Sequence, residues 1–480
     1  MLKSTHTADS DTATGSPSAR WVLVSLSLSM LLSSLGTSIA NVGLPTLTQV
    51  FNASFQQVQW VVLAYLLAIT TLIVSVGRLG DLIGRRRLLL AGIALFTCAS
   101  ALCGAAPTLS LLITARAVQG LGAAIMMALT MAFVGETVSK KKTGSAMGLL
   151  GTMSAVGTAL GPSLGGVLIA GLNWRAIFFV NVPLGIVSFM LAQRYLPPDR
   201  QQQSKTGARF DYIGTLLLAL TLSAYALAVT LGRGHFGVLN LALLLAAVLG
   251  MALFVLTEAK VSSPLLRISM FRDPVLSSSL GMNALVSTVM MATLVVGPFY
   301  LTRSLGLSDV MVGLLMSVGP VISACSGIVA GRIVDRIGAQ RMVIAGLIAM
   351  TTGAFALALL PSLFGIAGYV AAITILTPGY QLFQAANNTA VMLDIRPEQR
   401  GLVSGMLNLS RNLGLITGAS FMGAVFAFAS ASSDIRMAAP DAIADGMRVT
   451  FMVAGVMVVG ALVIAGIGRV LARRGLDSGN

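Results

Sequence analysis

The chain is poor in charged residues, and this shortage already restricts the class of protein. Only 10% of its 480 residues are Asp, Glu, Lys or Arg, against about 25% in soluble globular proteins. Hydrophobic residues make up 56%, which excludes a disordered chain. A water-soluble fold of this length would lack the polar groups needed to cover its surface. The composition therefore predicts an integral membrane protein.

Cysteine and histidine are also scarce. Cys98, Cys103 and Cys325 are too few for a disulfide framework, and His6 and His235 lie outside the predicted helices. The chain has neither a G-x-x-x-x-G-K-[ST] segment nor a zincin signature, and no catalytic constellation. We therefore expect no enzyme activity, no cofactor and no metal. Drive by ATP within this chain is also excluded, which leaves an ion or solute gradient as the energy source.

The formal net charge is +15, but the basic residues are distributed as in the loops of a membrane protein. A nucleic-acid-binding protein places its basic residues on one exposed face or along a basic helix. Here they form short clusters between apolar runs, such as 85–87 and 140–142. We therefore expect no nucleic-acid partner and assign the excess charge to membrane topology.

Long apolar windows predict an all-α membrane protein with 14 spanning helices, because one span needs about 20 mostly apolar residues. Residues 21–77 and 342–393 contain no charged residue, and each is long enough for two spans. Turns are expected at Pro45 to Asn52 and at Pro361. The predicted spans are 21–44, 58–77, 88–106, 109–135, 144–171, 176–196, 212–232, 236–258, 275–301, 310–330, 342–360, 363–390, 401–430 and 448–470.

The predicted loops on the two sides differ strongly in basic residues. Most Lys and Arg fall in loops on the side of the N-terminus, and few fall on the other side. Those on the other side are Arg175, Arg233, Arg303, Arg436 and Arg448. Because basic loops stay in the cytoplasm, both termini are expected to be cytoplasmic, with the protein in the inner (plasma) membrane.

Two pairs of segments repeat at nearly the same offset. The run Gly77-Arg-Leu-Gly-Asp81-Leu-Ile-Gly84-Arg85-Arg86 matches Gly331-Arg-Ile-Val-Asp335-Arg-Ile-Gly338. Glycines of the fifth predicted span match those of the thirteenth: Gly144, Gly148, Gly157, Gly161 and Gly166 correspond to Gly401, Gly405, Gly414, Gly418 and Gly423. Two homologous halves suit a rocking transporter.

The repeat predicts a division of the chain into two halves with an insertion between them. In order, we expect a disordered cytoplasmic tail (1–20), a six-helix half (21–196), a cytoplasmic loop (197–211), two inserted helices (212–258), a cytoplasmic linker (259–274), a second six-helix half (275–470) and a cytoplasmic tail (471–480).

These segments resemble signatures of the major facilitator superfamily, and more narrowly of its fourteen-helix drug:proton antiporters. Residues 77–87 resemble the G-x-x-x-D-x-x-G-R-R/K signature, and Arg116-Ala-Val-Gln119-Gly-Leu-Gly resembles R-x-x-Q-G-x-G. Gly157-Thr-Ala-Leu-Gly161-Pro162-Ser-Leu-Gly165-Gly166 looks like the antiporter motif of exporters.

The resemblance implies a major facilitator fold with two six-helix halves plus two inserted helices. It also implies a secondary active transporter, by default a monomer, that exports hydrophobic or amphipathic drugs by proton antiport. Its partners would be a small-molecule substrate, protons and the lipid bilayer.

One position departs from the exporter pattern. Exporters of this group usually carry an Asp in helix 1, assigned to drug recognition or proton coupling, and the matching position here is Gly36. Arg116 and Arg411 lie inside predicted spans, where charged side chains are costly and tend to be functional. These features leave a second interpretation open, a permease for a neutral or anionic metabolite.

Candidate residues fall into four groups. A gate is expected from Gly77, Asp81, Gly84, Arg85, Arg86, Asp335 and Gly338, since an acid can bind the N-terminus of a neighbouring helix in one conformation only. Coupling is expected at Arg116, Gln119 and Arg411. For both arginines a structural role, as a hydrogen-bond donor to carbonyls or to neighbours such as Asn408, stays open.

The third group is the antiporter motif Gly157, Gly161, Pro162, Gly165 and Gly166, which is expected to pack tightly where the halves meet. The fourth group is a mid-membrane cavity, for which substrate contact and helix packing are both allowed. Its candidates are Ser34, Thr37, Ser38, Asn41, Tyr65, Met127, Asn283, Met291, Gln384, Asn387, Asn388 and Asn408.

Overall fold

The computed structural model describes residues 17–53, 55–199, 211–230, 237–261, 264–393, 395–430 and 439–477. Most of the expected 1–20 tail and 197–211 loop, and the end of the 471–480 tail, lie outside these ranges. The described residues are helical, without strands. The helices are α1 (Pro17–Val50), α2 (Phe55–Ile83), α3 (Arg85–Ala105), α4 (Leu109–Thr137), α5 (Thr143–Gly171), α6 (Ala176–Phe179), α7 (Asn181–Tyr195), α8 (Tyr212–Thr230), α9 (Val238–Glu258), α10 (Pro274–Phe299), α11 (Asp309–Ile337), α12 (Ala339–Met392), α13 (Arg400–Ala429) and α14 (Pro440–Asp477).

Thirteen helical segments of the described chain are long and apolar enough to cross a membrane, with α6 and α7 joined in one. The longest, α12, reverses direction at Gly365, where φ is 55° and ψ is −127°. Gly346 packs against Phe383 and Gly353 against Leu376, so α12 is a hairpin of two antiparallel helices. The prediction of fourteen crossings is therefore confirmed, and the chain is a multi-pass membrane protein.

The turn inside α12 does not lie at its predicted position. Pro361 is buried within the helix, and the reversal follows at Gly365. Proline bends a helix but keeps φ negative, whereas this reversal needs a positive φ, which glycine adopts without a steric cost.

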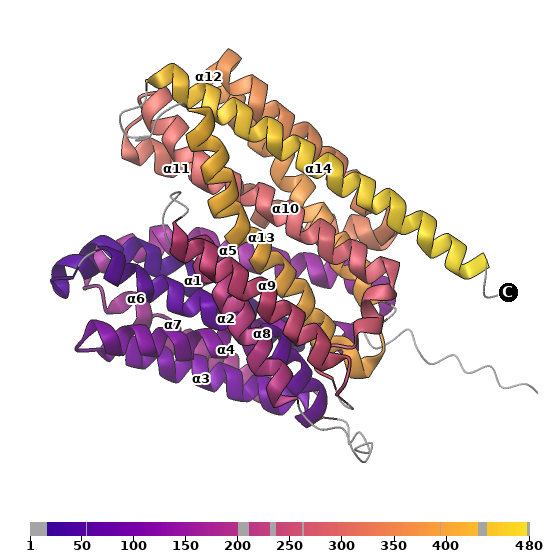
Figure 1. Ribbon diagram of the computed structural model, residues 1–480. Coiled ribbons are helices and arrows are strands. Elements are labelled where there is room, and N and C mark those ends of the chain that lie inside the picture. The colour runs from indigo at the N-terminus through magenta and orange to yellow at the C-terminus, as the bar shows by residue number, and fades with distance from the viewer. Residues whose placement is uncertain are drawn as a thin grey trace, which may run out of the picture.

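The helices form two groups that repeat one packing scheme. Figure 1 shows α1–α7 together on one side and α10–α14 on the other. In the first half α1 packs along α5, and in the second half α10 packs along α13. Between the halves, α2 contacts α13 and α5 contacts α11. This is the arrangement of two six-helix halves that the repeat predicts.

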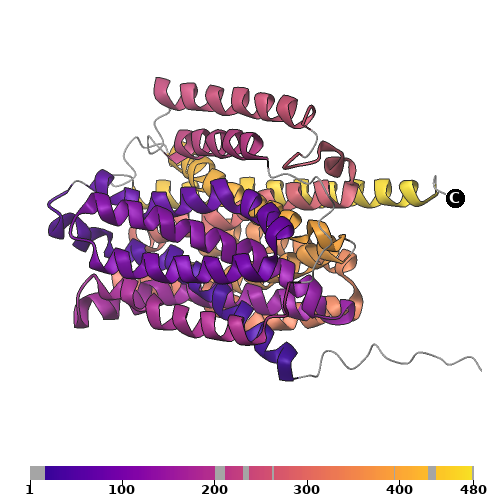
Figure 2. The same cartoon turned by 90° about the horizontal axis from the view of Figure 1, so that it is seen from below.

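The inserted helices α8 and α9 lie outside this bundle. They pack on each other, and α8 also contacts α2 and α13. Figure 2 shows the pair stacked on one flank of the molecule, with α9 outermost. Apolar side chains of α9, such as Leu245 and Val248, are exposed there and suit contact with lipid. The insertion therefore leaves the contacts between the two halves intact.

We call the end of the bundle where α2 meets α3 and α11 meets α12 the motif end. The helices run alternately up and down, so the first described residues of α1 and the last of α14 also lie at this end. The starts of α5 and α13 face the same end, which brings four interhalf helix termini together.

Candidate transport site

Asp81 joins the two halves at the motif end. It lies in the last turn of α2, and its carboxylate is 1% exposed. Its oxygens accept hydrogen bonds from the backbone N–H of Gly401 and of Leu402, both at 3.0 Å, at the start of α13. A carboxylate at this place satisfies free N–H groups and interacts favourably with the positive end of the helix dipole.

Arg85 extends this contact into a small ionic network. Its Nε and Nη2 donate to Asp81 Oδ1 at 3.0 and 2.7 Å. It also forms an ion pair with Glu136 at the end of α4 and donates to the carbonyl oxygen of Pro397, just before α13. The expected gating residues Asp81 and Arg85 therefore do meet, and they hold elements of both halves.

Asp335 repeats the contact from the opposite half. It lies near the end of α11 and accepts from the backbone N–H of Gly144 at 2.7 Å and of Ser145 at 2.9 Å, at the start of α5. The Ser145 hydroxyl donates to it as well. Ala339 stands where the first half has Arg85, so this second contact lacks the arginine.

Glycines allow the helices to approach closely beneath both contacts. A Cβ on Gly77 would overlap the carbonyl oxygen of Gly401, and a Cβ on Gly401 would overlap that of Gly77. Gly144 and Gly331 are related in the same way. Together with the two Asp contacts, these glycine contacts join the two halves at the motif end, and we call this set of contacts the motif-end gate.

Gly84 and Gly338 precede α3 and α12 with φ of 106° and 101°, a backbone conformation that favours glycine.

Arg86 takes no part in the ionic network. Its side chain donates to Gln193 O at the end of α7. Its backbone N–H, with that of Arg87, donates to Asp199 at 2.8 and 3.2 Å. Asp199 thus binds the start of α3, a role that no sequence signal identified, because the residue follows Pro197 and Pro198 in a region read as loop.

Arg116 is completely buried in the first half. Its Nε donates to Val61 O at 2.9 Å, its Nη2 to Gly36 O at 3.1 Å and its Nη1 to Gln119 Oε1 at 2.6 Å. Its guanidinium lies 4.1 Å from the centroid of the Tyr65 ring, a cation–π distance. A buried charge needs such partners, and here neutral groups of α1, α2 and α4 supply them.

Gly36 belongs to the same cluster, at the position where exporters usually carry an Asp. A Cβ there would lie 3.0 Å from the Tyr65 hydroxyl and 3.3 Å from the Phe96 ring. Tyr65 uses that hydroxyl to donate to Ser33 O at 2.8 Å. The space for a helix 1 side chain is thus filled, and the Gly36 carbonyl contacts Arg116 instead.

The antiporter motif does not lie where it was expected. Gly157 packs against the α1 backbone at Leu31, and Gly161 packs against Ser38, also on α1. Gly165 contacts Ile39 of the same helix, and a Cβ on Gly166 would meet nothing within 4 Å. The expectation of packing between the halves is corrected: this stretch binds α5 to α1 within the first half. The reason is helical phase, because Gly144 and Gly148 on another part of α5 face α11.

Several polar candidates form hydrogen bonds within one half. Ser34 Oγ and Ser154 Oγ are 2.8 Å apart, and Ser38 donates to Gly157 O. Thr37 and Asn41 donate to carbonyls one turn earlier on α1. These side chains are held within the N-terminal half by their own helix or by the α5 neighbour.

Other candidates gather in the second half. Asn283 on α10 donates to Leu407 O at 2.8 Å, and Asn387 on α12 to Ser279 O at 3.4 Å. Gln384 donates to the Tyr380 hydroxyl. Met291 packs against Gly418, and Asn388 is partly buried on α12.

Asn408 crosses between the halves. Its side-chain amide donates to Met127 O at 3.5 Å and to Met131 Sδ at 3.1 Å on α4. Ser404, one turn earlier on α13, donates to Ala128 O at 2.5 Å, a contact that sequence reasoning missed. α13 therefore also contacts α4, further along the helix than the motif-end gate and toward the membrane interior.

Arg411 stands one turn beyond Asn408 on α13 and is partly exposed. Its Nε is buried and has no hydrogen-bond partner among the described residues. It thus differs from Arg116, whose nitrogens are all bonded.

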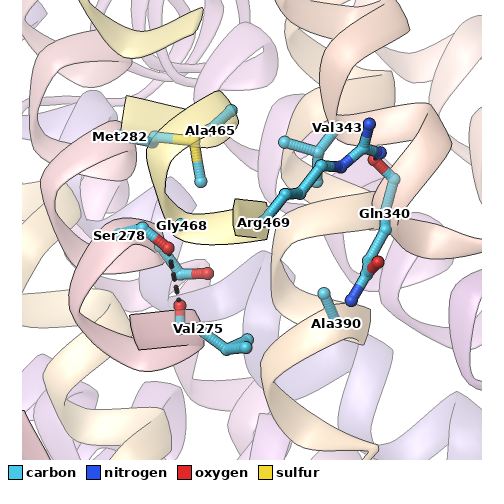
Figure 3. Close-up of a pocket in the computed structure, with 10 residues that line it drawn as sticks. Val275, Ser278, Met282, Gln340, Val343, Ala390, Ala465, Gly468 and Arg469 are labelled. Carbon is cyan, nitrogen blue, oxygen red and sulfur yellow. Dashed lines mark hydrogen bonds between the residues drawn. The ribbon is translucent and has the colours of Figure 1, made fainter. Parts of the chain in front are cut away.

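A separate pocket, shown in Figure 3, lies at the motif end between α10, α12 and α14. Arg469 borders it and donates to the carbonyl oxygen of Gln340. Its lining residues are Val275, Ser278, Ser279, Met282, Gln340, Val343, Ala390, Ala465, Gly468 and Arg469. None of these is a predicted site residue.

Two pseudo-symmetric six-helix halves, joined by matching contacts at one end, suit a membrane transporter. The comparisons give its family. Residues 26–419 match the model described as Major Facilitator Superfamily, and the chain belongs to that family. Its members are transporters and not enzymes.

Two curated relatives cover most of the chain. Riboflavin transporter RibZ of Clostridioides difficile is 30% identical over 85% of this chain and 88% of its own. Multidrug resistance protein Stp of Mycobacterium tuberculosis is 30% identical over 87% of this chain and 78% of its own.

Among solved structures, the human organic anion transporter MFSD10 has a TM-score of 0.65. It is 14% identical, with 94% of this chain and 100% of that chain covered. This likeness shows the major facilitator fold.

Proposed function

We propose that the protein exports hydrophobic or amphipathic compounds across the plasma membrane by proton antiport with alternating access. The observation that carries this proposal is the motif-end gate, in which Asp81 and Asp335 each bind a helix start of the opposite half. Contacts of this kind exist only while that end is closed, so breaking them opens it. Relatives named for multidrug resistance or efflux support export, among them the multidrug resistance protein Stp and the multidrug efflux pump LfrA of Mycolicibacterium smegmatis.

Proton coupling follows from the chemistry of Asp81. Protonation would remove its negative charge, and with it the charge-assisted bonds to Arg85 and to the α13 start. A proton would therefore weaken the closed gate directly. In this proposal the motif end is cytoplasmic, as the basic loops predict, with both chain termini on that side. Arg116 and Gln119 tie α1, α2 and α4 together so that the first half moves as one body.

A drug-susceptibility panel in an efflux-deficient host tests the proposal. Cells that produce the wild-type protein should tolerate higher concentrations of some amphipathic compounds than cells with an empty vector. Arg116→Ala should abolish this tolerance, whereas Arg303→Ala, at an exposed position, should keep it. Membrane amounts of all variants are measured alongside. An unchanged susceptibility to every compound tested, at normal membrane abundance, would argue against drug export.

A further inference from the structure

Arg411 lies deep in the membrane interior. At 1.5 Å per residue it stands roughly 16 Å along α13 from Arg400, about half of the ~30 Å hydrocarbon thickness. In the described spans, acidic side chains occur only near helix ends. A mid-membrane cation without a carboxylate nearby is expensive, and such residues mark substrate or ion paths.

Two polar atoms of α10, beside the α13 residues that flank Arg411, also lack partners among the described residues. Leu407 and Gly414 lie one turn to either side of Arg411 on the same face of α13. Asn283 contacts Leu407, and Ser287 packs against Gly414. Asn283 is 1% exposed and Ser287 0%, yet Asn283 Oδ1 and Ser287 Oγ have no hydrogen-bond partner among the described residues.

The matching place in the first half is closed. Arg411 corresponds to Ser154 in the repeat, and Ser154 Oγ is paired with Ser34 Oγ at 2.8 Å. The second half thus places a cation with an unpartnered nitrogen, a hydroxyl and an amide oxygen where the first half has a satisfied pair of serines. Native proteins rarely leave several buried polar groups unpaired, and such groups need an explanation.

We propose that Arg411, with Ser287 and Asn283, forms the polar part of the substrate site and binds an anionic group of an amphipathic compound. This inference rests on the proposed transport function and names its substrate class. A guanidinium binds a carboxylate or similar oxyanion through directed, charge-assisted bonds. The Ser287 hydroxyl can donate to the same anion, and the Asn283 oxygen can accept from a neighbouring substrate O–H or N–H. Met291, which packs against Gly418 two helical turns beyond Arg411, suits the apolar part of the compound.

The test uses two dyes that share a ring system and differ in charge. The full-length protein is reconstituted in phosphatidylcholine vesicles, a pH gradient is imposed, and flux of anionic carboxyfluorescein and of a cationic rhodamine methyl ester is followed by fluorescence. Wild-type protein should transport the anionic dye faster. Arg411→Gln should raise the half-saturating concentration of the anionic dye about tenfold or more and leave the cationic dye unaffected or improved. Arg411→Lys should recover most of the affinity for the anionic dye that Arg411→Gln loses.

Arg303→Gln, which removes an exposed arginine, is the matched control and should behave as wild type. A purely structural role for Arg411 predicts that Arg411→Gln slows both dyes equally, which would overturn the substrate assignment. Wild-type preference for the cationic dye would also overturn it while leaving the transport function standing, and this comparison needs no variant to fold. Flux of neither dye, or flux independent of the gradient, would overturn the proposed function and this inference with it.

Discussion

Asp81→Asn should open the motif end. The wild-type carboxylate is 1% exposed and accepts two backbone bonds from α13 and two from Arg85. Bonds to a charged group contribute about 1.5–3 kcal/mol each, and asparagine keeps one oxygen but no charge. A loss of about 2–3 kcal/mol would lower the ratio of closed to open molecules roughly 30- to 150-fold. A ratio of about 100 to 1 would then approach 1 to 1.

Spin labels can report this opening directly. Arg87 and Arg341 occupy matching exposed positions at the starts of α3 and α12, one in each half. Electron–electron distance measurements between labels there should give a short distribution in the wild-type background and a second, longer one with Asp81→Asn. Asp335→Asn should act in the same direction. Asp441→Asn, at an exposed position at the opposite end, should change nothing. Identical distributions for wild type and Asp81→Asn would refute the gate.

Three further predictions concern packing and helix caps. Gly161→Ala places a Cβ on Ser38 Oγ and should abolish transport, whereas Gly166→Ala, with nothing within 4 Å, should transport normally; equal vesicle flux for both would contradict the packing role. Gly36→Ala should lower thermal stability by about 1–3 kcal/mol, because its Cβ meets the Tyr65 hydroxyl at 3.0 Å. Adding Tyr65→Phe should recover part of that loss. If thermal melts of the double variant show a loss of stability equal to the sum of the two single losses, the clash is refuted. Asp199→Ala should lower stability by about 1–2 kcal/mol through the lost cap on α3, while Asp199→Asn should lose less; a melting temperature equal to wild type would remove the cap from the account.

The fourteen crossings could be predicted from the sequence because the bilayer requires long uncharged helices, and charge-free windows mark them directly. The contacts of two acidic residues with helix starts could also be predicted. Asp81 and Asp335 repeat in glycine-bounded segments, and an acid beside a helix start has a defined electrostatic partner. The repeat places both acids in matching segments, and their bonds to Gly401 and Gly144 match as well.

The structural features that the sequence did not predict depend on helix phase and on single residues in loops or turns. The spacing of Gly157 and Gly161 predicts close packing but not the partner, and the partner is α1. The reversal at Gly365 depends on a local positive φ, whereas Pro361 is the stronger turn signal in the sequence. Asp199 contacts α3 from a distant part of the chain, a tertiary contact that no local pattern encodes.

The most direct test of coupled transport measures proton movement and substrate movement in the same vesicles. The full-length protein is reconstituted with a pH indicator trapped inside, and an amphipathic substrate is added across an imposed pH gradient. The account predicts substrate-dependent dissipation of the gradient, accompanied by substrate movement in the opposite direction, and loss of both signals with Asp81→Asn. Substrate flux that leaves the gradient untouched, or a gradient that decays equally without substrate, would contradict it.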